Sequence, residues 1–207
     1  MQRYLYIILI LISSTALACP PEGDGGDPIL NRLKNRTSIP QRPTAQTIST
    51  FLHNNTPDLH TRKFRSEFTA AQTAYVDARE KTGVMLEGYL LDAHQSGPET
   101  ANCHQMEDRD FHVWLGERAG VDKREAKDLR AGSIVVEPTP QGQRAHSDWR
   151  LHILRKLVRD GARVRITGWL MYDPEHPDQL GRTRATLWEL HPVTKIEVQS
   201  GGRWREL

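Results

Sequence analysis

The spacing of apolar residues changes at Gly83, and this change constrains the fold more than any other feature of the chain. Over residues 58–82 apolar side chains recur at helical spacing between charged ones, which predicts one amphipathic helix. From residue 83 onward apolar and polar residues alternate, as in β-strands with one buried face. The alternating segments are 84–93, 110–115, 133–137, 163–172 and 185–190, with an extension at 193–198 beyond a kink at His191-Pro192. A second helical pattern, at 149–160, separates the third strand from the fourth.

Three strands, one helix and two strands form the element order of the OB-fold, a partly open Greek-key barrel. We therefore predict a mainly β fold with α: a five-stranded OB-like barrel at 83–207, with its helix between strands three and four and an N-terminal amphipathic helix at 58–82. The segments 164–170 and 188–194 resemble those of uncharacterised bacterial secreted proteins and lipoproteins with an OB-fold-like domain. This resemblance implies a fold and a cellular destination, but no activity.

The first 18 residues have the order of a secretory signal peptide, with Arg3, an apolar run at 4–12 and small residues before Cys19. Residues 16–19 also resemble the lipobox of bacterial lipoproteins, which implies lipidation of Cys19. The polar, glycine- and proline-rich composition of 19–57 predicts a flexible tether. We therefore predict a protein of the bacterial cell envelope, on its periplasmic side, attached to the lipid membrane through acylated Cys19. The alternative is cleavage to a soluble secreted protein.

The chain contains two cysteines, Cys19 and Cys103. An acylated Cys19 cannot form a disulfide, and Cys103 would then be a lone thiol in an oxidising compartment. Without the lipid, a disulfide between the two cysteines becomes available. The two interpretations exclude each other.

The densest polar group in the sequence lies between the first two strands. Cys103, His104, Asp110 and His112 are residue types that bind zinc, and His191 is a further candidate ligand, with His146 as its alternative. Asp110 and His112 are two apart on a strand, so we expect them on one face. A second interpretation makes Cys103 a nucleophile with His104 or His112 as its base. A third is an ordinary polar loop, since no known metal-ligand spacing is present.

The fourth predicted strand suggests a binding face, because Arg163, Arg165 and Trp169 alternate with apolar residues and point away from the core. Arg182 and Arg184 could extend this face into one basic patch. Arginine beside tryptophan can stack on bases or sugar rings. The alternative is that the helix at 58–82 covers this face.

The overall charge does not decide between these ligands, because the net charge is only +2. We predict a non-enzymatic, envelope-anchored or secreted binding module for an unknown protein, glycan or oligonucleotide. The alternative is a metal-assisted hydrolase that uses zinc at the cluster around Asp110.

Overall fold

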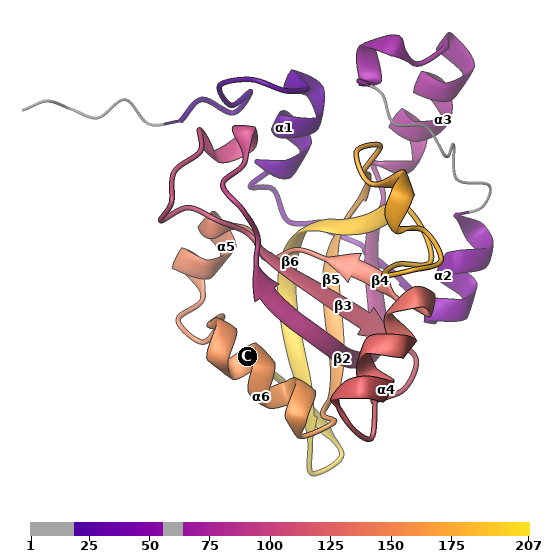
Figure 1. The fold of residues 1–207 in the computed structure, drawn as a ribbon, viewed down its shortest axis with the longest axis vertical. Coiled ribbons are helices and arrows are strands. Elements are labelled where there is room, and N and C mark those ends of the chain that lie inside the picture. Colours follow the sequence, from indigo (N-terminus) through magenta and orange to yellow (C-terminus); the bar gives the residue numbers. More distant parts are fainter. Residues whose placement is uncertain (1–18, 56–63) are drawn as a thin grey trace, which may run out of the picture.

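The alternating segments pair into a closed five-stranded barrel in the computed structural model, which describes residues 19–55 and 64–207 (Figure 1). The predicted signal peptide therefore lies outside the described residues. The barrel strands are β2 (Gly83–Gln95), β3 (Phe111–Gly116), β4 (Ile134–Val136), β5 (Arg163–Tyr172) and β6 (Trp188–Ser200). Their order is β2-β3-β4-β6-β5, and pairing of β5 with β2 closes the barrel.

The strand order and the position of helix α6 (Leu151–Arg159) confirm the predicted OB-like barrel. β4 and β6 pair in parallel at Val136 and Leu190, whereas the other barrel pairs are antiparallel. Helix α6 lies between β4 and β5 in the chain, as the pattern at 149–160 predicted, although it is shorter. It packs on the barrel because Leu154 and Leu157 form a buried stripe on one face.

The last barrel strand departs from its predicted form. The sequence predicts two segments separated by a kink, but β6 runs unbroken through Pro192 and begins only at Trp188. Proline cannot donate to the ladder, and the register between β5 and β6 shifts around Gly168. A Cβ atom on Gly168 would lie 2.7 Å from the carbonyl oxygen of Pro192, so only glycine allows this close approach.

A short strand that the sequence analysis missed, β7 (Arg203–Glu206), forms a hairpin with β6. Gly201 and Gly202 make the turn with φ angles of 56° and 75°. Two consecutive residues with positive φ are the requirement of a tight hairpin turn, so this glycine pair was a usable signal.

The segment 19–55 is folded, and the prediction of a flexible tether is wrong there. It forms α1 (Pro28–Lys34), β1 (Thr44–Gln46) and α2 (Ile48–Asn54), and β1 adds to β2 in parallel. Asp27 caps α1 by accepting from two backbone amides at its N-terminus. The segment 19–55 buries Leu30, Ile48 and Phe51, and these apolar contacts allow it to pack on the barrel although most of its residues are polar.

The predicted helix at 58–82 is also shorter than expected. Residues 56–63 lie outside the description, and the remainder forms η1 (Arg65–Glu67) and α3 (Ala70–Arg79). Phe68 and Tyr75 contact Tyr172 and Trp188 at the end of the barrel, with ring centroids 6.3 and 6.0 Å apart. The helix thus buries its stripe against the end of β5 and the start of β6.

The remaining helices are short and lie in the connections between strands. They are η2 (Thr100–Asn102), α4 (Lys123–Leu129), η3 (Arg130–Gly132), α5 (Pro140–Ala145) and η4 (Pro177–Gln179). Among the described residues, none of the helices has the length and apolar character needed to cross a membrane.

Candidate functional site

The strand register places four ionisable side chains in one row across the barrel wall. His94 on β2 is paired with His112 on β3, and their rings stack 5.3 Å apart. The pairing of β3 with β4 continues this row to Glu137, the residue after β4. The parallel pairing of β4 with β6 then brings Glu137 beside His191. The row therefore depends on three strand pairings, which join distant parts of the sequence.

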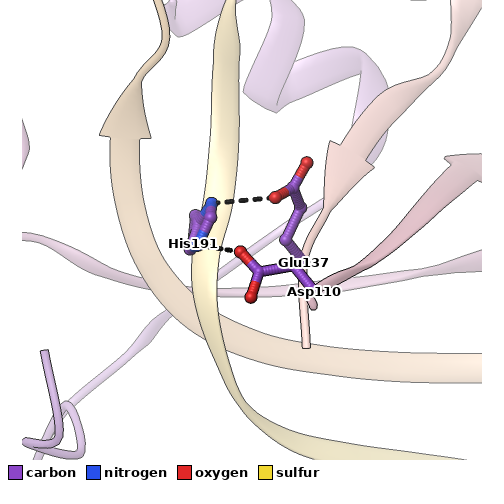
Figure 2. A group of neighbouring side chains, drawn as sticks. All are labelled: Asp110, Glu137 and His191. Atoms are coloured by element: carbon purple, nitrogen blue, oxygen red, sulfur yellow. Dashed lines mark ion pairs between the residues drawn. The ribbon is translucent and has the colours of Figure 1, made fainter. Parts of the chain in front are cut away.

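Two members of this row, Glu137 and His191, form a buried chain of contacts with Asp110 (Figure 2). Nδ1 of His112 lies 3.0 Å from Oε1 of Glu137, and Oε2 of Glu137 lies 3.1 Å from Nδ1 of His191. On its other nitrogen, His191 lies 3.3 Å from Oδ2 of Asp110. The histidine is therefore held between two carboxylates and is fully buried.

Burial and neighbouring charges act in opposite directions on these groups. Burial alone would lower the pKa of His191, but Glu137, Asp110 and Glu189 outweigh it and hold that pKa well above its usual value. Burial would raise the pKa of Glu137, and the two neighbouring imidazoles instead hold it well below its usual value. For Asp110 burial prevails, and its pKa is raised. Neighbouring ionisable groups whose pKa values are shifted in this way are common at functional sites.

A second set of buried charges adjoins the row. Arg184 contacts Glu189 and lies 3.3 Å from Oδ2 of Asp173, and its own side chain is fully buried. Asp173 also pairs with His176, whose pKa is raised chiefly by that hydrogen bond. Glu189 lies 3.7 Å from Nδ1 of His191, so the two sets are continuous.

A polar cavity of about 760 Å³ opens beside these charges. Its walls come from the N-terminal segment around Lys34, the end of β2 at His94, the loop at 96–104, strand β3, Glu137 after β4, the loop at 173–183 and Glu189 on β6. His112, Glu137 and Glu189 line it, so the buried row reaches the cavity through their side chains. Trp114 lies against His94 and His112, with Arg130 stacked on it 4.6 Å from the ring centroid.

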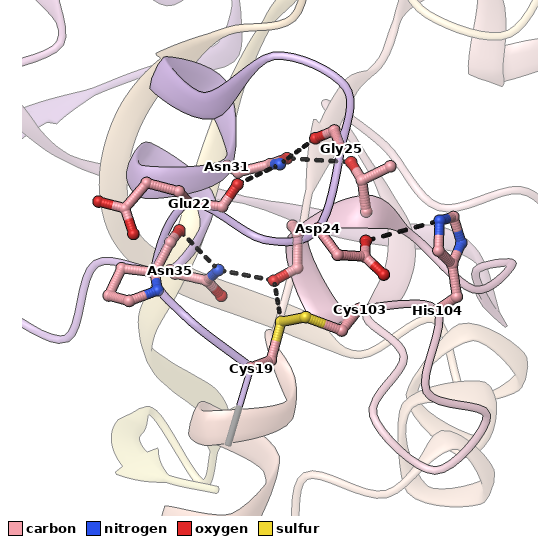
Figure 3. The surroundings of a disulfide bond; sticks show 11 residues. Cys19, Glu22, Asp24, Gly25, Asn31, Asn35, Cys103 and His104 are labelled. Carbon is pink, nitrogen blue, oxygen red and sulfur yellow. Dashed lines mark hydrogen bonds and ion pairs between the residues drawn. A yellow bond between two sulfur atoms is a disulfide. The ribbon is translucent and has the colours of Figure 1, made fainter. Parts of the chain in front are cut away.

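The structure separates the predicted metal ligands into two groups. Asp110, His112 and His191 meet in the buried cluster, and Asp110 and His112 both point into it, as the strand spacing predicted. Cys103 and His104 lie outside this cluster, beside the N-terminal segment (Figure 3), although His104 lines the same cavity.

Cys103 is bonded to Cys19, with their Cα atoms 5.7 Å apart. A disulfide sulfur can neither carry a lipid nor bind zinc nor act as a nucleophile. The disulfide therefore corrects three predictions: acylation of Cys19, zinc binding by Cys103, and Cys103 as a nucleophile. His104 is exposed and lies 3.6 Å from Asp24. His146, the alternative third imidazole, stacks on Trp149 and takes no part in the cluster.

The predicted binding face on β5 is occupied by the protein's own side chains. Arg163 and Arg165 both pair with Glu87, at 2.8 and 2.6 Å, and Arg165 stacks on Trp204, 4.2 Å from its ring centroid. Trp204 belongs to β7, the strand that the sequence analysis missed.

The other three residues of the predicted face, Trp169, Arg182 and Arg184, do not join Arg163 and Arg165 in one surface. The indole nitrogen of Trp169 donates to the carbonyl of Ser38, and Arg36 lies over its ring. Arg184 is buried, whereas Arg182 lines the cavity. The five residues do not form one basic patch; of them, Arg182 remains available to a ligand at the cavity.

Glu137 is the functional candidate that the sequence analysis missed, together with the buried carboxylates Asp173 and Glu189. The predicted OB-fold could have indicated Glu137, because the third strand of this fold pairs with the fifth. A carboxylate at the end of the third strand is then expected near the histidine on the fifth.

Comparison with protein-family models, with curated proteins and with solved structures finds no match to this chain. The resemblance to secreted bacterial proteins therefore stays a prediction.

Proposed function

We propose that this chain is a secreted, non-enzymatic OB-like binding module, whose ligand enters the cavity beside His112 and Glu137. The signal-peptide pattern at 1–18 supports export to the periplasm or the exterior of a bacterial cell. The disulfide supports it independently, because disulfides form and persist in oxidising compartments. Acylation of Cys19 forms no part of this proposal.

The cavity is the observation that carries the proposal. Its volume of about 760 Å³ falls within the usual range for small-molecule sites. Its polar walls are held in place by ion pairs, such as Lys34 with Glu99 at 2.7 Å and Arg130 with Asp92 at 3.0 Å. Side chains fixed in this way lose little conformational entropy when a ligand binds.

The charges of the cavity favour a glycan over an oligonucleotide. Three cationic residues line it, namely Lys34, Arg130 and Arg182. They face twice as many carboxylates, namely Glu99, Glu137, Asp173, Glu175, Asp178 and Glu189. This excess of negative charge repels phosphates. Sugar hydroxyls can instead donate to the carboxylates, and His94 and Trp114 supply aromatic surface.

Isothermal titration calorimetry with short oligomers of glucose and of N-acetylglucosamine tests the proposal, with a thymidine oligonucleotide as the competing class. We expect binding of at least one neutral oligosaccharide and weaker binding of the oligonucleotide. His94→Ala should weaken the sugar complex, because His94 is exposed and lines the cavity. His152→Ala is the matched control, because His152 is exposed on α6 and does not line the cavity.

Two results would contradict the proposal. The first is an oligonucleotide that binds more tightly than every sugar, and the second is a sugar complex that is unaffected by His94→Ala. The other prediction, a metal-assisted hydrolase, would need a different ligand set from the predicted one, because Cys103 is oxidised and the ligand atoms that converge with Asp110 are those of Glu137 and His191.

A further inference from the structure

The buried cluster contains three side chains arranged as ligands around a common point. Asp110, Glu137 and His191 each offer one ligand atom, and these atoms lie within 4.8 Å of one another. They come from three separate places in the chain: the residue before β3, the residue after β4, and the beginning of β6. Strand pairing, rather than local sequence, therefore brings them together.

His191 is incompletely satisfied in this environment. Carboxylate oxygens lie 3.1 and 3.3 Å from its two ring nitrogens. Neither nitrogen, however, makes a hydrogen bond of acceptable geometry with the described part of the chain. A buried polar group without a hydrogen bond costs about 1–3 kcal/mol, so it calls for another partner.

The charge around the cluster is also unbalanced. Four buried carboxylates lie in contact with this network, namely Asp110, Glu137, Asp173 and Glu189. Arg184 is the only permanent cation that contacts any of them among the described residues, because Lys34 pairs with Glu99. The other positive charge beside these carboxylates comes from His176 and His191, whose pKa values are raised. Buried charges need a nearby charge of opposite sign. A divalent cation would supply two positive charges at the position where the carboxylates are most crowded.

We propose that Asp110, Glu137 and His191 form a binding site for a divalent transition-metal ion, with zinc as the best fit. Zinc accepts imidazole and carboxylate ligands together, whereas magnesium and calcium prefer oxygen ligands alone. Ligands about 2.1 Å from a tetrahedral ion are about 3.4 Å apart. Because the ion can bind only one nitrogen of His191, either the 3.1 Å from Nδ1 to Glu137 or the 3.3 Å from Nε2 to Asp110 is a ligand–ligand distance, and each is close to this separation.

The neighbouring side chains determine which atoms of His191 and Glu137 would bind the ion. His191 can bind the ion through one nitrogen only, and the other nitrogen then donates to a nearby carboxylate. His112 holds Oε1 of Glu137 at 3.0 Å and leaves Oε2 toward His191, so it would fix the orientation of this carboxylate toward a bound ion. Because Glu137 also lines the cavity, the remaining coordination position would face the cavity.

Calorimetric titration of chelator-treated protein with zinc chloride, supported by metal analysis after dialysis, tests the site. We expect one equivalent of zinc in the wild type. Asp110→Asn and Glu137→Gln should each weaken binding by about 100-fold or more. Asp173→Asn is the matched control, because it removes a buried charge of the same network without removing a ligand. Its zinc affinity should stay much closer to that of the wild type.

Circular dichroism shows whether each variant is folded, and using two ligand variants keeps the test decisive if one of them unfolds. Wild-type protein that binds no zinc overturns the proposal. Zinc binding that survives in both folded ligand variants also overturns it, because the ion would then occupy exposed histidines. No sugar is present in this experiment, so the metal site and the glycan proposal succeed or fail separately.

Discussion

Arg184 offers the strongest test of the buried charge network, because a single substitution removes the cation that two carboxylates share. Its side chain is fully buried, contacts Glu189, and lies 3.3 Å from Asp173. Methionine at this position keeps most of the aliphatic volume and removes the charge. Removing one partner of a buried ion pair costs about 3–5 kcal/mol, so Arg184→Met should lower the free energy of unfolding by that amount.

Urea unfolding at neutral pH, followed by tryptophan fluorescence, measures this change. Arg182→Met is the matched control, since Arg182 lies two residues away and is exposed; its effect should stay within about 0.5 kcal/mol. The penalty of Arg184→Met should decrease at acid pH, because Glu189, whose pKa is already raised by burial, can then become neutral. A folded Arg184→Met variant as stable as Arg182→Met would refute the view that these carboxylates depend on Arg184.

Three further predictions test other parts of the structure. Cys103→Ala should destabilise the oxidised protein by about 4.5 kcal/mol, because the disulfide links residues 84 positions apart; equal stability under non-reducing conditions would argue against the bond. The contribution of His176, whose pKa is raised, is complete below about pH 6.5 and is lost as the pH rises through the folded value. The difference in melting temperature between wild type and His176→Gln should therefore shrink with rising pH. A difference that grows with pH would show that the pKa of His176 is not raised in the folded protein. Leu154→Asp should cost several kcal/mol and unfold the barrel, whereas His152→Asp on the exposed side of α6 should not; similar melting curves for the two would reject the packing of α6.

The barrel could be predicted from the sequence because its information is local. Alternating residues define each strand, and the apolar stripe of α6 defines the helix between the third and fourth strands. The adjacency of Glu137 and His191 is different, because it depends on the parallel register between β4 and β6. A register shift of one residue turns every side chain of a strand to the opposite face, so periodicity alone could not place these two together.

The N-terminal segment shows the opposite limitation. Its polar composition predicted a tether, yet Leu30, Ile48 and Phe51 are buried, and Asp27 and Thr47 cap the two helices. Composition averages over a segment, whereas docking needs only a few apolar residues at the right spacing. The disulfide to Cys103 then holds this segment beside the loop that forms one wall of the cavity.

The energetic cost of the buried network argues that it is not there for stability. The barrel interior elsewhere is filled with valine, leucine, isoleucine and aromatic side chains. Replacing a buried ion-pair network by apolar residues of similar volume is often neutral or stabilising. Buried carboxylates and imidazoles therefore have to be explained by something other than packing, and here they lie against a polar cavity that Glu137 and Glu189 help to form. Because Glu137 and Glu189 reach this cavity, an ion or a ligand bound there would contact charges whose burial the packing of the barrel does not explain.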